Sequence, residues 1–285
     1  MQQLLILSGK GGTGKTTVAG ALIQLCQSRA YADCDVDAPN LHLVAPRLSE
    51  PEKTAYYGFK KALIDASRCT RCGQCEQNCR FAAISGFAVD EFACEGCGVC
   101  AAICPAQAIT MQDHIAGEQM LYQGDGKVFS TARLKMGSGA PGKLITAVKQ
   151  RLMREAPECG LAIIDGSPGI GCPVIASVAG VDLVLIVAEP TISGIHDLKR
   201  IIDTAAYLDV QCAVCVNKFD INLPHTEQIK AYCHELRIPV IGLIPFDETV
   251  IRAVNNCHSI ADYPDSPAGQ AMIAIWENLR RLFIG

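Results

Sequence analysis

The sequence has no long run of basic residues and no apolar run of the roughly 20 residues that a membrane-spanning helix needs. Charged residues make up only 19% of its 285 residues, and the formal net charge is -4. These shortages favour neither bulk attraction to nucleic acid nor a membrane span. The opening residues, MQQLLILSGK, lack a positive leader and a small-residue cleavage site, so we interpret them as a buried strand and expect a cytoplasmic protein.

Cysteine, by contrast, is abundant, with sixteen in the chain and eight of them between residues 69 and 104. A disulfide scaffold is typical of short secreted chains, so clustering in a long chain favours metal ligands in a reducing compartment. The two groups read CTRCGQCEQNC and CEGCGVCAAICP, and both have the C-x2-C-x2-C-x3-C spacing of two-cluster bacterial ferredoxins. Zinc fits this spacing less well, because its four ligands usually come as two separated pairs.

In such ferredoxins, three cysteines of a run bind one [4Fe-4S] cluster and the fourth binds the other cluster. The spacing therefore predicts two four-cysteine sets that exchange their last members. The first run departs from the pattern at Arg80, where the ferredoxin pattern has proline, which concerns the local backbone rather than the ligands. We expect two clusters, one held by Cys69, Cys72, Cys75 and Cys104 and the other by Cys79, Cys94, Cys97 and Cys100.

On both sides of the cysteine segment, short apolar runs such as LAIIDG and DLVLIVAE alternate with helical stretches. Apolar runs without alternation are typical of strands covered on both faces of a parallel sheet. We predict an α/β fold, with a mostly parallel P-loop NTPase sheet and helices on both faces. The nucleotide-binding domain is expected to comprise 1–59 and 116–285, and the inserted dicluster ferredoxin-like domain 60–115.

The stretch SGKGGTGKTT follows the first apolar run and opens a helix, which is the context that a phosphate loop requires. Glycines there let backbone N–H groups approach phosphate oxygens, and the helix N-terminus favours negative charge. Lys15 is expected to bind the β- and γ-phosphates, and Thr16 to bind Mg²⁺. The loop residues expected to contact the nucleotide are Gly9, Gly11, Gly12, Thr13, Gly14, Lys15, Thr16 and Thr17.

A second acidic motif, LAIIDGSPG, places Asp165 at a strand end. A carboxylate there can hold Mg²⁺, and Gly169 could offer its N–H to the γ-phosphate. KGGTGKTT, together with DCDVDAPNL and IIDGSPGIG, resembles the MinD/ParA class of P-loop ATPases, which includes the nitrogenase iron protein and the Mrp-type iron–sulfur carriers. With its cysteine insert, the chain looks like MinD-superfamily ATPases that carry an inserted ferredoxin domain.

This resemblance implies an ATP-hydrolysing homodimer in which Lys10 reaches the partner's nucleotide. It also implies that Asp35 positions the attacking water and that Asp33 lies nearer the magnesium. The role of Asp37 is open. Three residues match the family's base-contacting positions: Asn217, Pro245 and Asp247.

Several alternatives stay open. Asp220 in VNKFD also fits a guanine-reading pattern, which leaves GTP beside ATP, and Cys172 lies near a position that ligates a bridging cluster in the nitrogenase iron protein. Two clusters in one insert favour nucleotide-gated electron transfer to a redox or metallocluster partner protein. The alternatives are an ATP-dependent factor for assembly or delivery of a metal or iron–sulfur cluster, and a nucleotide-dependent scaffold with redox-sensing clusters.

Overall fold

The computed structural model describes residues 1–46 and 48–284, and the chain forms two compact units. The first unit comprises Met1–Glu52, Met120–Ala132 and Gly142–Gly285, and the second comprises Lys53–Gln119 and Arg133–Pro141. The sequence placed the insert at 60–115. The observed second unit extends further because it takes in most of β3 (Glu52–Tyr57), the start of β8 (Ile115–Gly124) and the end of β9 (Lys127–Leu134).

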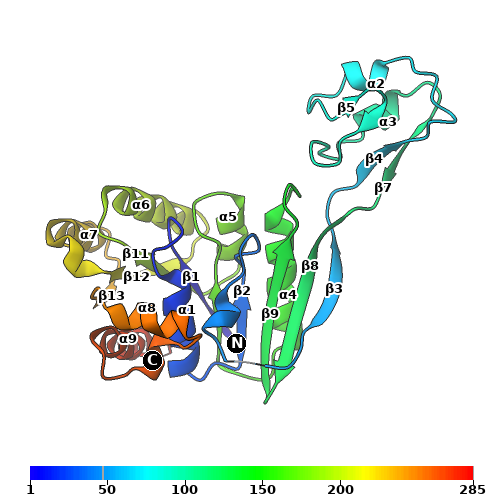
Figure 1. Cartoon of the computed structure of the whole chain (residues 1–285). Helices are drawn as coiled ribbons and strands as arrows, with labels where there is room; N and C mark the ends of the chain where they lie inside the picture. Colours follow the sequence, from blue (N-terminus) through cyan, green and yellow to red (C-terminus); the bar gives the residue numbers. More distant parts are fainter. Residues whose placement is uncertain (47, 285) are drawn as a thin grey trace. The chain divides into compact units, whose positions relative to one another are not determined.

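A mostly parallel sheet forms the centre of the first unit (Figure 1). Its strand order is β13-β12-β11-β1-β10-β2-β9, and each neighbouring pair in this series is parallel. β8 and β3 continue the order beyond β9. This confirms the predicted α/β class. The remaining strands are β1 (Gln2–Leu7), β2 (Ala30–Asp33), β10 (Leu161–Asp165), β11 (Leu183–Ala188), β12 (Gln211–Asn217) and β13 (Val240–Ile244).

Apolar strands explain why helices cover both faces of this sheet. Leu4, Leu5, Ile6 and Leu7 of β1 are all fully buried, although successive side chains point to opposite faces. Leu4 and Ile6 share one core cluster with apolar residues of α1 and α9. Figure 1 shows α1, α8 and α9 on one face and α5 and α6 on the other. The helices are α1 (Lys15–Leu25), α4 (Pro141–Glu155), α5 (Cys172–Val178), α6 (Ile192–Tyr207), α7 (Leu223–Glu235), α8 (Glu248–Asn255) and α9 (Pro267–Leu279).

The parallel arrangement has a direct consequence for the site. The carboxyl ends of β1, β2, β10, β11 and β12 meet at one edge of the sheet. Ligands of open α/β sheets bind at that edge. Every strand-end motif identified in the sequence therefore lies on the same side of the first unit.

The second unit is built from two short antiparallel pairs and two short helices. β4 (Lys61–Ile64) pairs with β7 (Ile109–Gln112), and β5 (Ile84–Ser85) pairs with β6 (Ala88–Val89). The helices are α2 (Gln74–Gln77) and α3 (Val99–Ile103). Its small core contains cysteines among its buried members: Ala62, Cys75, Ala83, Ile84, Cys94 and Ile109.

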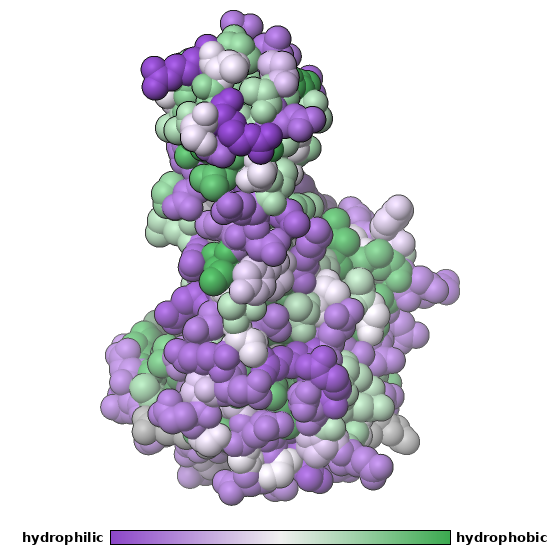
Figure 2. Space-filling model, turned by 90° about the vertical axis from the view of Figure 1, so that its right-hand side faces the viewer, coloured by the Kyte–Doolittle hydropathy of each residue, from purple (hydrophilic) through white to green (hydrophobic). Residues whose placement is uncertain are grey.

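Figure 2 shows hydrophilic and hydrophobic side chains interspersed over the face that it displays. Within residues 1–46 and 48–284, none of the helices has the length and apolar character needed to cross a membrane.

Candidate functional site

The phosphate loop connects β1 to α1 and needs glycine for its shape. Gly12 has φ 80° and Gly14 has φ 92°, which is the left-handed region that other residues rarely adopt. A Cβ at Gly14 would also lie 2.3 Å from the side-chain nitrogen of Asn217, so the loop and the end of β12 could not approach as they do. The local sequence thus sets both the turn and its contact with β12.

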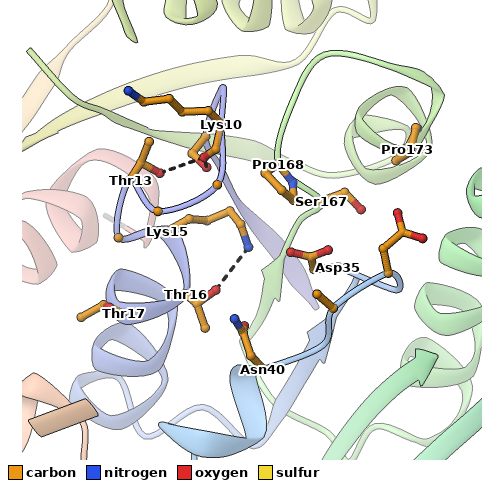
Figure 3. A pocket seen from close by; sticks show the side chains of 16 residues that line it. Lys10, Thr13, Lys15, Thr16, Thr17, Asp35, Asn40, Ser167, Pro168 and Pro173 are labelled. Atoms are coloured by element: carbon orange, nitrogen blue, oxygen red, sulfur yellow. Dashed lines mark hydrogen bonds between the residues drawn. The ribbon is translucent and has the colours of Figure 1, made fainter. Parts of the chain in front are cut away.

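A pocket of about 580 Å³ lies over this loop (Figure 3). It brings the predicted residues Lys10, Lys15 and Asp35 together although they come from two different strand ends. Asp37 also lines the pocket, which gives that residue a place beside the expected nucleotide. The remaining lining residues are Ser8, Gly11, Gly12, Thr13, Gly14, Thr16, Thr17, Ala38, Asn40, Ser167, Pro168 and Pro173.

Asp165 contacts both functional residues at the start of α1. Its carboxylate forms a buried ion pair with the Lys15 ammonium, and its Oδ2 accepts a hydrogen bond of 2.7 Å from the Thr16 hydroxyl. A hydroxyl beside a carboxylate is the oxygen donor pair that Mg²⁺ takes in P-loop proteins. The residues present therefore fit the expected ion, and magnesium binding by Thr16 and Asp165 stays a prediction.

Asp33 is fully buried and holds the loop that follows β2. Its Oδ1 accepts from the backbone N–H of Asp35, and its Oδ2 accepts from those of Asn40 and Leu41, each at 2.9 Å. Burial raises the pKa of Asp33, and the nearby Asp165 raises it further. Both oxygens thus already have backbone partners, so the observed role of Asp33 is to shape the loop that presents Asp35. Its proximity to magnesium stays a prediction.

Asp35 lies in the pocket wall, half-buried. Burial raises the pKa of its carboxyl group above the ordinary value, although Lys15 opposes this effect. A carboxylate that is poorly solvated and faces the phosphate loop suits the predicted positioning of a water.

Two strand-end loops are joined behind the pocket. The Ser167 hydroxyl donates to the Cys34 carbonyl oxygen at 2.6 Å, and the Cys34 N–H donates to the Asp165 carbonyl oxygen at 2.7 Å. Gly169 has φ 99°, and its N–H donates to the Ser8 carbonyl oxygen at 3.0 Å. A contact from Gly169 to phosphate stays a prediction and requires this hydrogen bond to break.

The predicted base-side residues lie at the ends of β12 and β13. The Asn217 side-chain N–H₂ donates to the Thr13 carbonyl oxygen at 2.7 Å. Asp220 Oδ1 accepts from the Phe246 N–H at 2.8 Å, between Pro245 and Asp247. The loops after the two strands are therefore tied together by Asp220.

Asp247 caps α8 by accepting from the Thr249 N–H, and it also accepts from the Ala268 N–H. Burial alone would raise its pKa, but the hydrogen bonds from Ala268 and Thr249 outweigh this and hold the pKa below the ordinary value. Base contact by Asn217, Pro245 and Asp247 stays a prediction.

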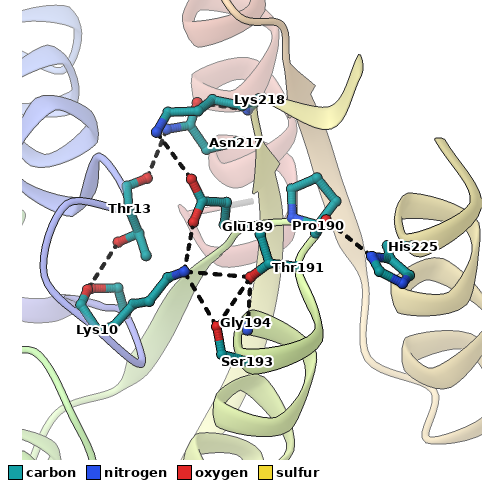
Figure 4. A network of polar contacts seen from close by, with 11 residues as sticks. Lys10, Thr13, Glu189, Pro190, Thr191, Ser193, Gly194, Asn217, Lys218 and His225 are labelled. Carbon is teal, nitrogen blue, oxygen red and sulfur yellow. Dashed lines mark hydrogen bonds and ion pairs between the residues drawn. The ribbon is translucent and has the colours of Figure 1, made fainter. Parts of the chain in front are cut away.

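Glu189 is a site residue that sequence reasoning missed. It follows β11 and pairs with two lysines, Lys10 at 2.9 Å and Lys218 at 3.0 Å (Figure 4). Burial would raise the pKa of Glu189, but hydrogen bonds from the two lysines hold it below the ordinary value. The available signal was an acidic residue at the carboxyl end of a buried strand, DLVLIVAE, at the ligand-binding edge.

The cysteine-rich unit contains an internal repeat with an offset of 25 residues. Its cysteines recur at 69 and 94, 72 and 97, 75 and 100, and 79 and 104. The conformation repeats too, because Gly73 and Gly98 precede α2 and α3 with φ 78° and 77°. The sulfur of the fourth cysteine in each run accepts from a backbone N–H, that of Ala83 at 3.4 Å and that of Ala108 at 3.3 Å. The unit thus has two equivalent halves.

The fourth cysteines come close to the opposite runs. One cavity is lined by Cys79 together with Cys94, Cys97 and Cys100, which is one of the predicted sets. In the other set, burial raises the pKa of Cys75, and the nearby Cys69 and Cys104 thiols raise it further. Across the described residues, no three His, Cys, Asp or Glu side chains form a group that could hold one metal ion. Cysteine thiolates are the usual ligands of iron–sulfur clusters, so the residue types fit the predicted groups, and binding of two [4Fe-4S] clusters by these eight cysteines stays a prediction.

The sheet, the phosphate loop and the Thr16–Asp165 pair define a P-loop nucleotide-binding protein. The chain belongs to the family of the CobQ/CobB/MinD/ParA nucleotide binding domain, whose profile matches residues 4–260. It is 32% identical to an uncharacterized protein of Methanocaldococcus jannaschii over 98% of this chain and 97% of that protein.

Two further similarities to known proteins were found. The fold is similar to that of the septum site-determining protein MinD of Pyrococcus horikoshii, complexed with Mg-ADP. The TM-score is 0.60 at 17% identity, over 99% of this chain and 96% of that one. A shorter match, 28% identical over 141 residues, covers 43% of this chain and 42% of the cytosolic Fe-S cluster assembly factor NBP35 of Eremothecium gossypii.

Proposed function

We propose that the protein is an ATP-hydrolysing homodimer that couples its nucleotide state to electron transfer through two [4Fe-4S] clusters in the second unit. The observation that carries this proposal is the cavity that brings Cys79 to Cys94, Cys97 and Cys100. A cysteine from one run completes the set of the other run, as cluster ligation in two-cluster ferredoxins requires. When bound, each cluster supplies a one-electron redox centre.

In the first unit, the residues around the pocket have separate roles at the nucleotide. Lys15 exchanges Asp165 for phosphate oxygens, and Thr16 and Asp165 are then free to hold Mg²⁺. Asp35 orients the water. Because Ser167 binds the Cys34 carbonyl oxygen, a change in the loop after β10 is passed directly to the loop that carries Asp35. This contact supports a coupled response of both loops to the γ-phosphate.

The hydrogen bond between Asp220 and the Phe246 N–H supports ATP over GTP. A guanine-reading aspartate must accept from the guanine base, whereas one oxygen of this carboxylate already accepts from the backbone. We therefore propose adenine nucleotides as the substrates.

Cluster delivery is the second candidate function, and two observations favour it. One is the similarity to the assembly factor NBP35 over 43% of this chain. The other is that each half of the repeat has one exposed cysteine, Cys72 and Cys97. An exposed cysteine ligand can be replaced at its iron by a thiolate of an acceptor protein, and the displaced cysteine then takes up the proton that the acceptor thiol gave up.

One anaerobic experiment separates the two functions. The iron-loaded protein is reduced, MgATP and candidate partners are added, and the clusters are followed by EPR together with iron content. Nucleotide-dependent oxidation with full retention of iron supports electron transfer. Stoichiometric loss of iron to an apo-partner contradicts electron transfer and supports delivery.

A further inference from the structure

Lys10 is bound within its own chain by a carboxylate that it shares with a second lysine. Glu189 Oε2 lies 2.9 Å from Lys10 Nζ, and Glu189 Oε1 lies 3.0 Å from Lys218 Nζ. The Glu189 side chain is only 14% exposed, whereas those of Lys10 and Lys218 are 37% and 30% exposed. A nearly buried carboxylate with two partly exposed cations can lose one of them and remain paired.

The position of the Lys10 ammonium is unfavourable without that carboxylate. It lies 3.4 Å from the hydroxyls of Thr191 and Ser193, at the N-terminus of α6, where Thr191 is the capping residue (Figure 4). A helix N-terminus carries partial positive charge, which repels a cation. Glu189 offsets this repulsion, so Lys10 is held there by Glu189 rather than by the helix.

This position directs Lys10 away from the phosphate site of its own chain. In Figure 3 the Lys10 side chain leaves the loop on the opposite side from Lys15, whose ammonium points to Thr16. The pair with Glu189 therefore competes with any use of Lys10 at a phosphate.

Lys218 connects the same carboxylate to the end of β12. It follows Asn217, whose side-chain oxygen accepts from the Lys218 N–H at 3.0 Å and whose nitrogen donates to Thr13. Lys218 also has a left-handed backbone, with φ 53°. The backbone of Lys218, the second partner of Glu189, is thus held at the end of β12. Lys10, the first partner, lies on the phosphate loop instead.

We propose that Glu189 is a positioning residue that holds Lys10 on its own subunit, and that Lys218 makes this hold reversible by keeping Glu189 paired after Lys10 leaves. The ion pair between Lys10 and Glu189 forms within one chain. The release of Lys10 toward a partner's nucleotide rests on the homodimer of the proposed function. The two lysines therefore act in opposite directions on one equilibrium.

Two substitutions in the full-length protein separate this idea from a structural role. Glu189→Gln removes the charge at nearly constant volume, and Lys218→Met leaves Glu189 with Lys10 alone. Lys10 reactivity is measured in the nucleotide-free protein by acetylation and mass spectrometry, and dimerisation is measured by sedimentation with Mg-AMPPNP. Glu227→Gln, which breaks the exposed pair with Lys230 on α7, is the matched control.

Glu189→Gln is expected to raise Lys10 acetylation about two- to fivefold, the range of a partly exposed ion pair. Because a dimer releases two lysines, its dissociation constant should fall by about the square of that factor, roughly four- to twenty-five-fold. Lys218→Met should lower Lys10 acetylation and raise the dissociation constant of the dimer. The proposed role of Glu189 is contradicted if Lys10 acetylation is unchanged in Glu189→Gln. It is also contradicted if Lys10 acetylation changes in the same direction in Glu189→Gln and in Lys218→Met. A wild-type protein that stays monomeric with Mg-AMPPNP contradicts the proposed homodimer, while acetylation still decides the hold.

Discussion

The Thr16 hydroxyl and the Asp165 carboxylate lie 2.7 Å apart, although one opens α1 and the other ends β10. The β1–β10 register places Asp165 beside Ile6, just before the phosphate loop begins. Asp165 also forms an ion pair with Lys15, so one carboxylate contacts both the lysine that we expect to bind phosphate and the hydroxyl that we expect to bind magnesium. We therefore expect nucleotide binding to change the partners of Asp165.

Asp165→Asn is expected to remove most of the magnesium dependence of nucleotide binding. The amide cannot supply the negative charge, and a charge-assisted contact of this kind corresponds to a factor of roughly ten or more in affinity. Calorimetric titration with ATP, with and without Mg²⁺, gives the ratio of the two affinities. Asp203→Asn, on the exposed side of α6, is the control. A ratio equal to that of wild type would show that Asp165 does not contact the ion.

Lys10→Ala is expected to abolish hydrolysis while leaving the iron content of the second unit unchanged. The proposed dimer uses this lysine to stabilise charge on the partner's γ-phosphate, and such a cation contributes roughly 10³-fold or more to the rate. Phosphate release and iron content are measured on the same preparation. Lys230→Ala serves as the exposed-lysine control. Hydrolysis at the wild-type rate would contradict the role of Lys10 across the dimer.

The places of the phosphate loop and of Asp165 at strand ends could be predicted from the sequence, because a strand followed by a glycine-rich or polar turn can be recognised from consecutive residues. Their contacts with a nucleotide and magnesium stay predictions. Glu189 could not be predicted in this way, because its partners Lys10 and Lys218 follow other strands and meet it only in the folded sheet. The hydrogen bond from the Asn40 N–H to Asp33 could not be predicted either, because a side-chain-to-backbone contact leaves no pattern in the sequence. The proximity of Asp33 to magnesium, which the resemblance implies, stays a prediction.

Cys79→Ala is expected to expose the cysteines of the opposite run rather than those of its own run. Cys79 shares a cavity with Cys94, Cys97 and Cys100. If these four cysteines hold one of the proposed clusters, the loss of Cys79 should release its iron and leave the other three thiols reactive. Alkylation of the native protein, followed by peptide mapping, shows which cysteines become reactive. Cys257→Ala, an exposed cysteine of the first unit, is the control. Reactive Cys69 and Cys72 with a protected second run would refute the crossed assignment.

Asp35→Asn is expected to raise thermal stability, and more so at pH 7.5 than at a pH near the unfolded pKa of an aspartate, about 3.9. Burial raises the pKa of Asp35, so the folded state binds its proton more tightly than the unfolded chain does. Stability from this group is therefore fully present below the unfolded pKa and is lost as pH rises through the raised folded pKa. The asparagine avoids this loss, and an increase of about 1–3 °C in melting temperature corresponds to roughly 1 kcal/mol or less. An equal increase at both pH values would contradict the argument.

Gly96→Ala is expected to disrupt the second unit and to lower its iron content strongly. Gly96 has φ 67°, and a Cβ there would lie 2.2 Å from the Lys60 carbonyl oxygen, which is backbone and cannot rotate away. Gly86→Ala is the matched control, since Gly86 has φ 55° but nothing within 4 Å of an added Cβ. The control therefore reports the left-handed strain alone, about 1–2 kcal/mol, while Gly96→Ala adds the steric clash. Iron content and protease resistance of residues 53–119 are compared, with nucleotide affinity of the first unit measured in parallel. If both variants lose iron equally, the close approach of Lys60 is not what requires glycine at position 96.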